Sequence, residues 1–188
     1  MLGIAGPPGA GKTTLATELA ELANDQHGEA FAVVAPLDGF HLPNATLDER
    51  GLRQVKGAPE TFDCDGFLRS LAGVREEHQT SLWPTFHREL DEPTPDEIAI
   101  RPETKLVVVE GNYLLLNRPC WRDVRPLLDD VWYVDAPPDL LRRRLIARQI
   151  AHGRAEAEAT HHVDSSDMPN AELVGQTREQ ASRRIRTG

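Results

Sequence analysis

Short apolar runs alternate with amphipathic stretches along this chain. Four of the runs are nearly continuous and partly β-branched, as expected for strands that are buried on both faces: residues 2–5, 31–37, 106–109 and 131–134. Three stretches carry apolar residues at helical spacing: residues 13–22, 67–77 and 138–151. Buried strands separated by helices indicate βαβ units, so the pattern predicts an α/β fold with a parallel sheet.

The first predicted helix follows the first strand after a glycine-rich turn. Its residues Leu15, Leu19 and Leu22 recur at spacings of four and three, so they share one face, which we expect to pack on the sheet. A further short strand is expected near residues 181–185.

Two stretches resist assignment to regular elements. Residues 40–62 contain several prolines and glycines, and a connection of that length in a compact domain is usually functional or disordered. We predict a substrate-facing loop there. Residues 152–167 combine a glycine, an alternation of alanine and glutamate, paired histidines and paired serines, and we predict that this stretch is mobile and solvated.

The composition narrows the range of partners. A chain of 188 residues is long enough for one domain with a sizeable core, so we predict a single domain over residues 1–188. Lys and Arg total 21 against 30 for Asp and Glu, a formal net charge of −9, so nothing favours general binding to nucleic acid or to an anionic membrane. No stretch reaches the roughly 18 to 20 apolar residues of a membrane span, and the first apolar run is too short for a signal peptide. We therefore expect a cytoplasmic protein that holds any phosphate through a local site.

The chain has two cysteines. Cys64 and Cys120 lie far apart and show no Cys-x-x-Cys spacing, which suits neither a disulfide framework nor a thiolate metal site. We expect both to be ordinary packing residues.

A phosphate-binding motif lies between the first strand and the first helix. Residues 6–13 match G-x-x-x-x-G-K-[ST] and read Gly-Pro-Pro-Gly-Ala-Gly-Lys-Thr. The glycines let successive backbone N–H groups point at phosphate oxygens, and the start of the helix adds a favourable dipole. Lys12 supplies a charge to the β and γ phosphates, and the Thr13 hydroxyl suits Mg²⁺. The alternative is a glycine-rich turn that matches the motif by chance.

We therefore predict ATP and Mg²⁺ as the cofactors. The predicted nucleotide-binding residues come from the motif, the position after it and a distant helix: Gly6, Pro8, Gly9, Ala10, Gly11, Lys12, Thr13, Thr14 and Arg144.

Two acidic residues follow predicted strands directly. Asp38 ends the second apolar run and Glu110 ends the third, and ligands of open α/β sheets sit beyond the carboxyl ends of the strands. We predict that Asp38 takes the proton of an acceptor hydroxyl, while Glu110 acts with Thr13 as a metal ligand through a Mg²⁺ water. The alternatives are a turn-forming Asp before Gly39 and a strand-end Glu that pairs with a basic neighbour.

The third predicted helix is basic. Arg144 and Arg148 are four residues apart and share a face. Arginine stabilises charge on a transferred phosphoryl group, and this helix leads into the stretch predicted to be mobile, so it can act as a lid. Arg148 is the predicted catalytic arginine, with Lys12 and Asp38 as the other catalytic residues. For Arg142 and Arg143 we favour a solvated face that pairs with surface acids.

Other residues with metal-binding or stacking chemistry are assigned structural roles. His152, His161 and His162 with Asp164 have the chemistry of a metal site, but adjacent histidines on such a segment are more often exposed to solvent. The three tryptophans are expected to fill the core or its edges.

The chain resembles the P-loop kinase family that includes pantothenate kinase, uridine kinase and phosphoribulokinase, together with bacterial relatives of these enzymes. The likeness is most specific in five segments: residues 38–44, 49–52, 56–63, 110–115 and 134–137. It implies a three-layer α/β/α fold with a five-stranded, mainly parallel sheet, an acceptor-binding insertion at about residues 39–100 and a lid at about residues 142–166. It also implies ATP with Mg²⁺, Asp38 as the base and Arg148 as the lid arginine.

The predicted acceptor site matches the family at some positions and departs from the pantothenate kinases at others. For His41, which follows the Asp38 loop, a simple loop role is the alternative. The predicted acceptor-binding residues are Asp38, His41, Arg88, Asn112, Tyr113 and Asn170. Arg88 stands where pantothenate kinases have a substrate histidine, and Leu145 stands where they have a tyrosine, so we expect a different acceptor pocket. Arg88 suits an acidic or phosphorylated acceptor, or it is a loop arginine that pairs with Glu89 or Asp91.

Three kinds of function fit a P-loop. A GTPase-type switch lacks a visible Asn-Lys-x-Asp segment to read guanine. A non-kinase ATPase or nucleotide-dependent regulatory module keeps the motif and Glu110 but gives Asp38 no chemical role. We therefore predict a kinase that phosphorylates a hydroxyl of a small molecule, such as a nucleoside, a sugar or a pantothenate-like compound. The sequence leaves open which acceptor is used and whether the chain forms a homodimer.

Overall fold

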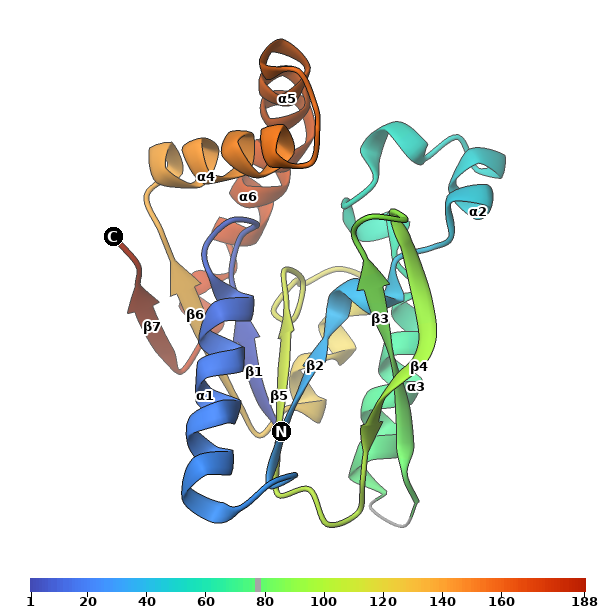
Figure 1. The fold of residues 1–188 in the computed structure, drawn as a ribbon, viewed down its shortest axis with the longest axis vertical. Helices are drawn as coiled ribbons and strands as arrows, with labels where there is room; N and C mark the ends of the chain where they lie inside the picture. Colours follow the sequence, from blue (N-terminus) through green and yellow to red (C-terminus); the bar gives the residue numbers. More distant parts are fainter. Residues whose placement is uncertain (77–78) are drawn as a thin grey trace.

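The computed structural model describes residues 1–76 and 79–188 and is built around a five-stranded parallel sheet (Figure 1). The strand order is β2-β5-β1-β6-β7. The bounds are β1 (Leu2–Ala5), β2 (Ala32–Pro36), β5 (Leu106–Gly111), β6 (Asp130–Asp135) and β7 (Arg183–Arg186). The four predicted apolar strands and the short last strand are confirmed, with bounds that shift by a few residues.

Helices cover both faces of this sheet, as the predicted three-layer fold requires. The main helices are α1 (Lys12–His27), α3 (Cys64–Arg75), α4 (Pro138–Ala151) and α6 (Met168–Gly175). Ala5 and Val109 belong to one buried cluster, whereas their neighbours Ile4 and Val108 belong to another. Successive strand residues are therefore buried on opposite faces, which explains why the apolar runs are nearly continuous.

Helix α1 approaches the sheet through small residues rather than through a leucine stripe. Ala16 and Ala20, four residues apart, are buried, whereas Leu15 and Leu19 are half-buried. The side chain of Leu22 is 55% exposed, so its predicted place in the core is wrong. Alanines at this spacing let the helix lie close to the strands. The leucines beside them then lie at the edge of the interface between helix and sheet.

The connection at residues 40–62 has more structure than predicted. It contains α2 (Asn44–Glu49) and two short 3₁₀ turns, Arg53–Val55 and Pro59–Thr61. Its ends are held together by backbone hydrogen bonds, among them the N–H of Asp63 donating to the carbonyl of Phe40 at 2.8 Å. An ordered connection of this kind presents fixed side chains instead of a loose loop.

An antiparallel hairpin, β3 (Ser81–His87) and β4 (Glu92–Ile100), follows α3 and was not predicted. Strand β4 opens with Glu-Pro-Thr-Pro-Asp-Glu, and most of its residues are exposed or half-buried. The sequence of such a polar strand contains no apolar run, so the hydrophobic pattern did not predict it. The helix predicted at residues 67–77 is confirmed as α3, although its predicted last residue, Glu77, lies outside the described residues.

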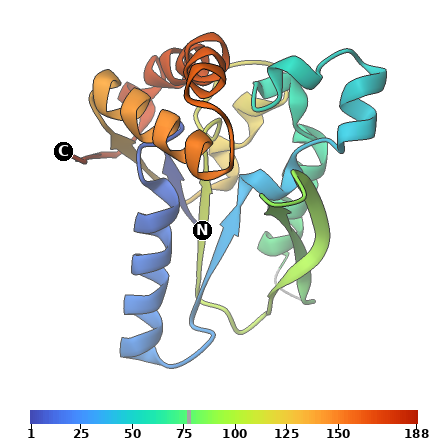
Figure 2. The same ribbon diagram turned by 45° about the horizontal axis from the view of Figure 1, so that its top comes forward.

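The stretch at residues 152–167 is mostly helical, contrary to the prediction of a mobile, solvated segment. Helix α5 (Glu156–His162) continues through a π-helical turn, Val163–Asp167, into α6. Ala159 and Val163 are fully buried, so this segment packs against the protein. The alternation of alanine and glutamate suits a helix, since both residues have high helix propensity. In Figures 1 and 2, α4, α5 and α6 stand on one side above the carboxyl ends of the strands, and α2 stands on the other.

The two cysteines form a disulfide, so their assignment as ordinary packing residues is wrong. The fold brings the start of α3 beside Cys120, with the two Cα atoms 6.2 Å apart. A separation of 56 residues and the lack of a spacing motif hide this pair in the sequence. The predicted role of the tryptophans is confirmed: Trp83 and Trp121 are buried in the core, and Trp132 packs at its edge beneath the Arg183 guanidinium.

Within the described residues, no helix combines the length and the apolarity that crossing a membrane requires.

Candidate nucleotide and acceptor site

The glycine-rich loop lies between the end of β1 and the start of α1. Gly11 adopts a φ of +99°, a left-handed conformation that side chains rarely accept. Gly6 has a different constraint, because a Cβ there would lie 2.5 Å from the carbonyl oxygen of Val134. The loop can therefore follow this path against β6 only with glycine at position 6.

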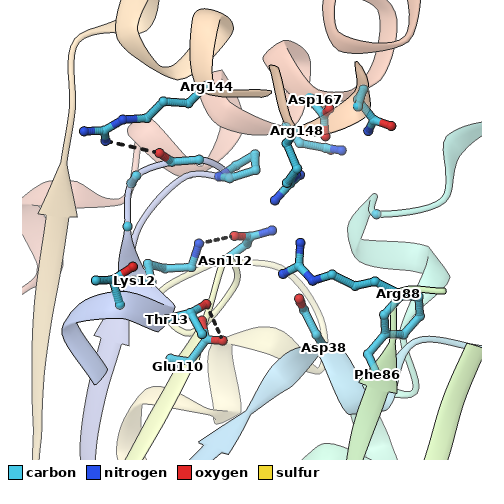
Figure 3. Close-up of a pocket in the computed structure, with 18 of the residues that line it drawn as sticks. Lys12, Thr13, Asp38, Phe86, Arg88, Glu110, Asn112, Arg144, Arg148 and Asp167 are labelled. Atoms are coloured by element: carbon cyan, nitrogen blue, oxygen red, sulfur yellow. Dashed lines mark hydrogen bonds between the residues drawn. The ribbon is translucent and has the colours of Figure 1, made fainter. Parts of the chain in front are cut away.

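A cavity of about 1050 Å³ opens above this loop. Loop and helix residues 8–15 form one wall. The other predicted site residues that line it come from five separate parts of the chain: Asp38, His41, Arg88, Glu110, Asn112, Arg144, Arg148 and Asn170 (Figure 3). The register of the parallel strands explains this convergence, because Pro36 pairs with Glu110 and Ala5 pairs with Gly111 at the same end of the sheet.

Two predicted site residues do not line the cavity. Gly6, the first residue of the loop, lies against β6 and away from the cavity. Tyr113 is fully buried in the core, and its hydroxyl donates a hydrogen bond to the carbonyl of Gly57. Tyr113 therefore supports the segment that carries Gly57, a cavity residue, instead of facing the acceptor space itself.

Lys12 is buried at the base of the cavity. Its ammonium donates to the carbonyl of Pro7 at 3.1 Å and to Oδ1 of Asn112 at 2.7 Å. Burial lowers the pKa of Lys12, while the carboxylates of Glu110 and Asp38 oppose that change. The predicted acceptor contact Asn112 is thus a partner of Lys12 in this structure.

Glu110 combines nearly complete burial with a raised pKa. Its side chain is 4% exposed, and Oε1 accepts a hydrogen bond of 3.1 Å from the Thr13 hydroxyl. Burial, followed by the nearby Asp38 carboxylate, raises the pKa of Glu110 to about 7, although Lys12 acts in the opposite direction. A buried carboxylate of this kind is typical of functional sites, where charge is compensated by a ligand or metal.

The Thr13 and Glu110 pair fits a magnesium ion. Within residues 1–76 and 79–188, no group of three or more His, Cys, Asp or Glu side chains has the arrangement of a metal site. Mg²⁺ at nucleotide sites usually takes only one or two protein ligands, because phosphate oxygens and water fill the other positions. One hydroxyl and one carboxylate therefore match the chemistry expected for a nucleotide-bound ion.

Asp38 lies in a 3₁₀ turn, Leu37–Phe40, directly after β2. Its half-buried side chain points into the cavity, across from the glycine-rich loop (Figure 3). The turn is pressed against β3, since a Cβ on Gly39 would lie 2.1 Å from the carbonyl oxygen of Pro84. The ring of His41 stacks near those of Phe62 and Phe86, at centroid distances of 4.0 and 4.7 Å.

Helix α4 supplies two arginines to the cavity from above. The Arg144 guanidinium lies 3.4 Å from the carbonyl oxygen of Gly9, at the edge of the loop. Burial lowers the pKa of Arg148, while the charge of Asp167 opposes this. Arg142 instead forms an exposed ion pair with Asp164, at 2.7 Å, as expected for a solvated basic face.

Several cavity residues were not identified from the sequence. They include Arg53, Lys56, Phe62, Phe86, His152, His162 and Asp167. Lys56 and Phe62 lie within a segment that carries the family resemblance, so that segment was the available signal. Asp167 has a buried carboxylate oxygen, Oδ2, with no hydrogen-bond partner among the described residues. Its nearness to Asn170 in the sequence was the only hint of a role.

Comparisons of the sequence with known proteins identify relatives that match most of this chain. No protein-family model matches the chain. It is 34% identical over 181 residues to a candidate uridine kinase of Schizosaccharomyces pombe, a match that covers 93% of this chain and 77% of that protein. It is 39% identical over 176 residues to the uncharacterized protein YggC of Escherichia coli, covering 94% and 73%.

Among solved structures, a candidate fructose transport system kinase from Silicibacter sp. TM1040 superposes with a TM-score of 0.91 at 35% identity. This match covers 98% of the present chain and 88% of the other.

Proposed function

We propose that this chain, which belongs to the P-loop kinase family that includes uridine kinase, pantothenate kinase and phosphoribulokinase, is an ATP-dependent phosphotransferase acting on a hydroxyl of a small molecule. One observation carries the proposal: a single cavity has the glycine-rich loop on one wall and the carboxylate of Asp38 on the opposite wall. That arrangement can hold a triphosphate and an alcohol side by side, with a base beside the alcohol.

The loop and the start of α1 bind the nucleotide in this proposal. Backbone N–H groups of residues 8–13 and the Lys12 ammonium contact the phosphates. Thr13 and Glu110 offer oxygen ligands for Mg²⁺, whose charge offsets that of the phosphates. Binding of the ion also compensates the buried Glu110 carboxylate, whose ionisation is otherwise unfavourable.

Asp38 performs the acid–base step. Its carboxylate accepts the proton of the acceptor hydroxyl as the oxygen forms a bond to the γ-phosphorus of ATP. The bond between that phosphorus and the bridging oxygen breaks, and ADP leaves with Lys12 near its β phosphate. Arg148, above the cavity, stabilises the charge that spreads over the transferred group.

Two further parts of the cavity lining come from the regions predicted as an insertion and a lid. Cavity residues between about 39 and 100 include His41 and Arg88, and those between about 142 and 166 include Arg144 and Arg148. We propose that the first region binds the acceptor and that the second closes over the nucleotide. A nucleoside, a sugar and a pantothenate-like compound all offer a suitable hydroxyl.

The variant Asp38→Asn tests the proposal, with Asp25→Asn, on the exposed side of α1 and outside the cavity, as the matched control. Asp38→Asn should retain binding of ATP–Mg²⁺ in calorimetry, because among the described residues no hydrogen bond or ion pair joins the Asp38 side chain to the loop. Acceptor-stimulated ADP release should fall by a factor on the order of 10² or more, as loss of a general base generally costs. Asp25→Asn should keep the wild-type rate.

Two results would contradict the proposal. If Asp38→Asn turns over an acceptor at the full rate, the aspartate is not the base, and a P-loop ATPase or regulatory module becomes the better reading. If the wild type shows no heat of binding with ATP–Mg²⁺, the nucleotide site itself is wrong.

A further inference from the structure

The acceptor side of the cavity carries an arginine that the phosphoryl-transfer chemistry does not use. Arg88 directly follows β3, and its guanidinium extends into the cavity beside Asp38, opposite Arg148 (Figure 3). Its positive charge is one of the smaller influences that act to lower the pKa values of Lys12, Glu110 and Arg148, so it lies close enough to interact electrostatically with these groups. Arg88 is therefore part of the site, although it comes from the hairpin that the sequence pattern did not reveal.

Two cations on the same side of the cavity, Lys56 and Arg53, have anionic partners, whereas Arg88 has none among the described residues. The Lys56 ammonium lies 3.0 Å from a carboxylate oxygen of Asp91, and Arg53 lies 3.3 Å from Asp48. Across residues 1–76 and 79–188, no carboxylate lies within 4.0 Å of the Arg88 guanidinium, which also donates no hydrogen bond. The predicted alternative, a loop arginine paired with Glu89 or Asp91, is therefore wrong, because Asp91 pairs with Lys56 and Arg53.

An unpaired guanidinium that faces other cations favours an anion between them. Lys12 and Arg148 have an anion available in the triphosphate, which binds on the loop side of the cavity. Arg88 lies on the other side, next to the proposed base and to the aromatic rings of Phe86 and His41. A planar guanidinium binds carboxylate or phosphate oxygens through two parallel hydrogen bonds.

We infer that the acceptor carries an anionic oxygen group, a carboxylate or a phosphate, which Arg88 binds while the hydroxyl to be phosphorylated lies at Asp38. The inference rests on the proposed function and deepens it by naming the substrate class. Binding of an anion near Asp38 would otherwise be opposed by that carboxylate, and the Arg88 charge offsets this repulsion. The rings of Phe86 and His41 contact the carbon skeleton between the two polar ends.

A competing role for Arg88 is contact with the transferred phosphoryl group, as proposed for Arg148. The two roles differ in one measurable quantity, the ratio of kcat/KM for a charged acceptor to that for its neutral counterpart. An arginine that binds the acceptor's anion controls this ratio. An arginine that binds the γ-phosphoryl group lowers turnover of every acceptor equally and leaves the ratio unchanged.

The experiment uses matched sets of compounds that share the length of the carbon chain and differ in whether they carry a carboxylate, a phosphate or no anionic group. One set is glycerol, D-glycerate and glycerol 3-phosphate, and a second is ribitol, ribonate and ribitol 5-phosphate. Acceptor-stimulated ADP release is measured for the wild type and for Arg88→Gln, Arg88→Lys and Arg101→Gln. Arg101 is an exposed arginine directly after β4 of the same hairpin and does not line the cavity, so Arg101→Gln is the matched control.

In the wild type, a charged member of a set should exceed the neutral member in kcat/KM by a factor on the order of 10². Arg88→Gln should abolish that preference, Arg88→Lys should keep part of it because the charge remains, and Arg101→Gln should retain it fully. The carboxylate and phosphate members show which of the two anions the site prefers. A neutral acceptor that equals or exceeds its charged partners, or a preference that survives in Arg88→Gln, overturns the inference.

A binding measurement decides the question even if no compound is phosphorylated. Thermal unfolding is followed with a non-hydrolysable ATP analogue and Mg²⁺ at saturation, so that the loop is occupied, while each compound is added at millimolar concentration. Charged members should raise the unfolding temperature of the wild type and of Arg101→Gln, but not that of Arg88→Gln. If charged and neutral members act alike, the anion site does not exist. If charged members stabilise but nothing is turned over, the proposed phosphotransfer fails while the anion site stands.

Discussion

Replacing Glu110 by glutamine should stabilise the nucleotide-free protein at and above neutral pH. Burial and the Asp38 carboxylate raise the pKa of Glu110 from an ordinary value of 4.5 to about 7. A difference of one unit between the pKa values of the folded and unfolded states corresponds to about 1.4 kcal/mol. The ionised side chain therefore lowers the free energy of unfolding by roughly 3 kcal/mol at pH 8. Glutamine keeps the size of the side chain and an oxygen that can accept the Thr13 hydrogen bond, but it carries no charge.

The direction in which pH changes the stability follows from proton binding. Between pH 4.5 and about 7 the folded protein keeps a proton on Glu110 that the unfolded chain has released. The free energy of unfolding of the wild type therefore falls as pH rises through this window, and this component is absent in Glu110→Gln. Lys12 loses an attractive partner in the variant, so the measured gain at pH 8 should be smaller than the full value.

Urea denaturation followed by tryptophan fluorescence from pH 5 to pH 8 measures the effect. The difference in free energy of unfolding between Glu110→Gln and the wild type should grow with pH. Glu103→Gln, an exposed glutamate just before β5, is the control and should follow the wild type at every pH. A variant that is equally or less stable than the wild type at pH 8, with an unchanged pH dependence, would refute the electrostatic reasoning.

Three further changes probe how the fold supports the site. Replacing Cys64 and Cys120 together by serine should lower the free energy of unfolding by about 4 kcal/mol in urea denaturation, because the bridge closes a loop across 56 residues of separation. Gly39→Ala should reduce acceptor-dependent turnover by about 10-fold or more while calorimetric ATP binding is kept, because the new Cβ meets the Pro84 carbonyl and displaces the turn that carries the proposed base. Leu145→Ala should cost about 2 to 5 kcal/mol in thermal or urea unfolding, since this side chain is fully buried.

Controls for these changes come from the same protein. Reduction of the wild type should reproduce the loss seen in the double serine variant, and an unchanged stability after reduction would exclude the bridge. Gly73→Ala, where a Cβ meets nothing closer than 3.8 Å, should leave turnover intact. Leu22→Ala should cost little, because Leu22 is 55% exposed, and an equal cost for Leu22 and Leu145 would contradict the described packing.

Much of the site was predictable because its parts are local in sequence or lie at strand ends. The glycine-rich loop is one continuous segment, so its role depends on residues that are neighbours in the chain. Asp38 and Glu110 are far apart in sequence, yet both directly follow buried strands. The parallel register brings such positions to the same edge of the sheet, and periodicity was enough to place them there.

The wrong predictions concern features that depend on contacts between segments instead of on a local hydrophobic pattern. The polar strand β4 is recognisable only beside β3, and the helical stretch at residues 156–167 is stabilised by packing of Ala159 and Val163. Tyr113 was assigned to the acceptor because of the segment it belongs to. Its position in the core follows from the packing of aromatic rings around it.

The sequence by itself determined the phosphate-binding loop, the parallel sheet and the two strand-end acids, because short-range spacing and strand polarity control these features. Only the tertiary structure decided which charges are paired, which cysteines meet and which side chains face the cavity. Pairing and burial depend on distances between residues that are remote in the chain, and no local pattern records them. Arg88 illustrates this: its residue type was visible in the sequence, but only the fold shows that no carboxylate in the described part of the chain pairs with it.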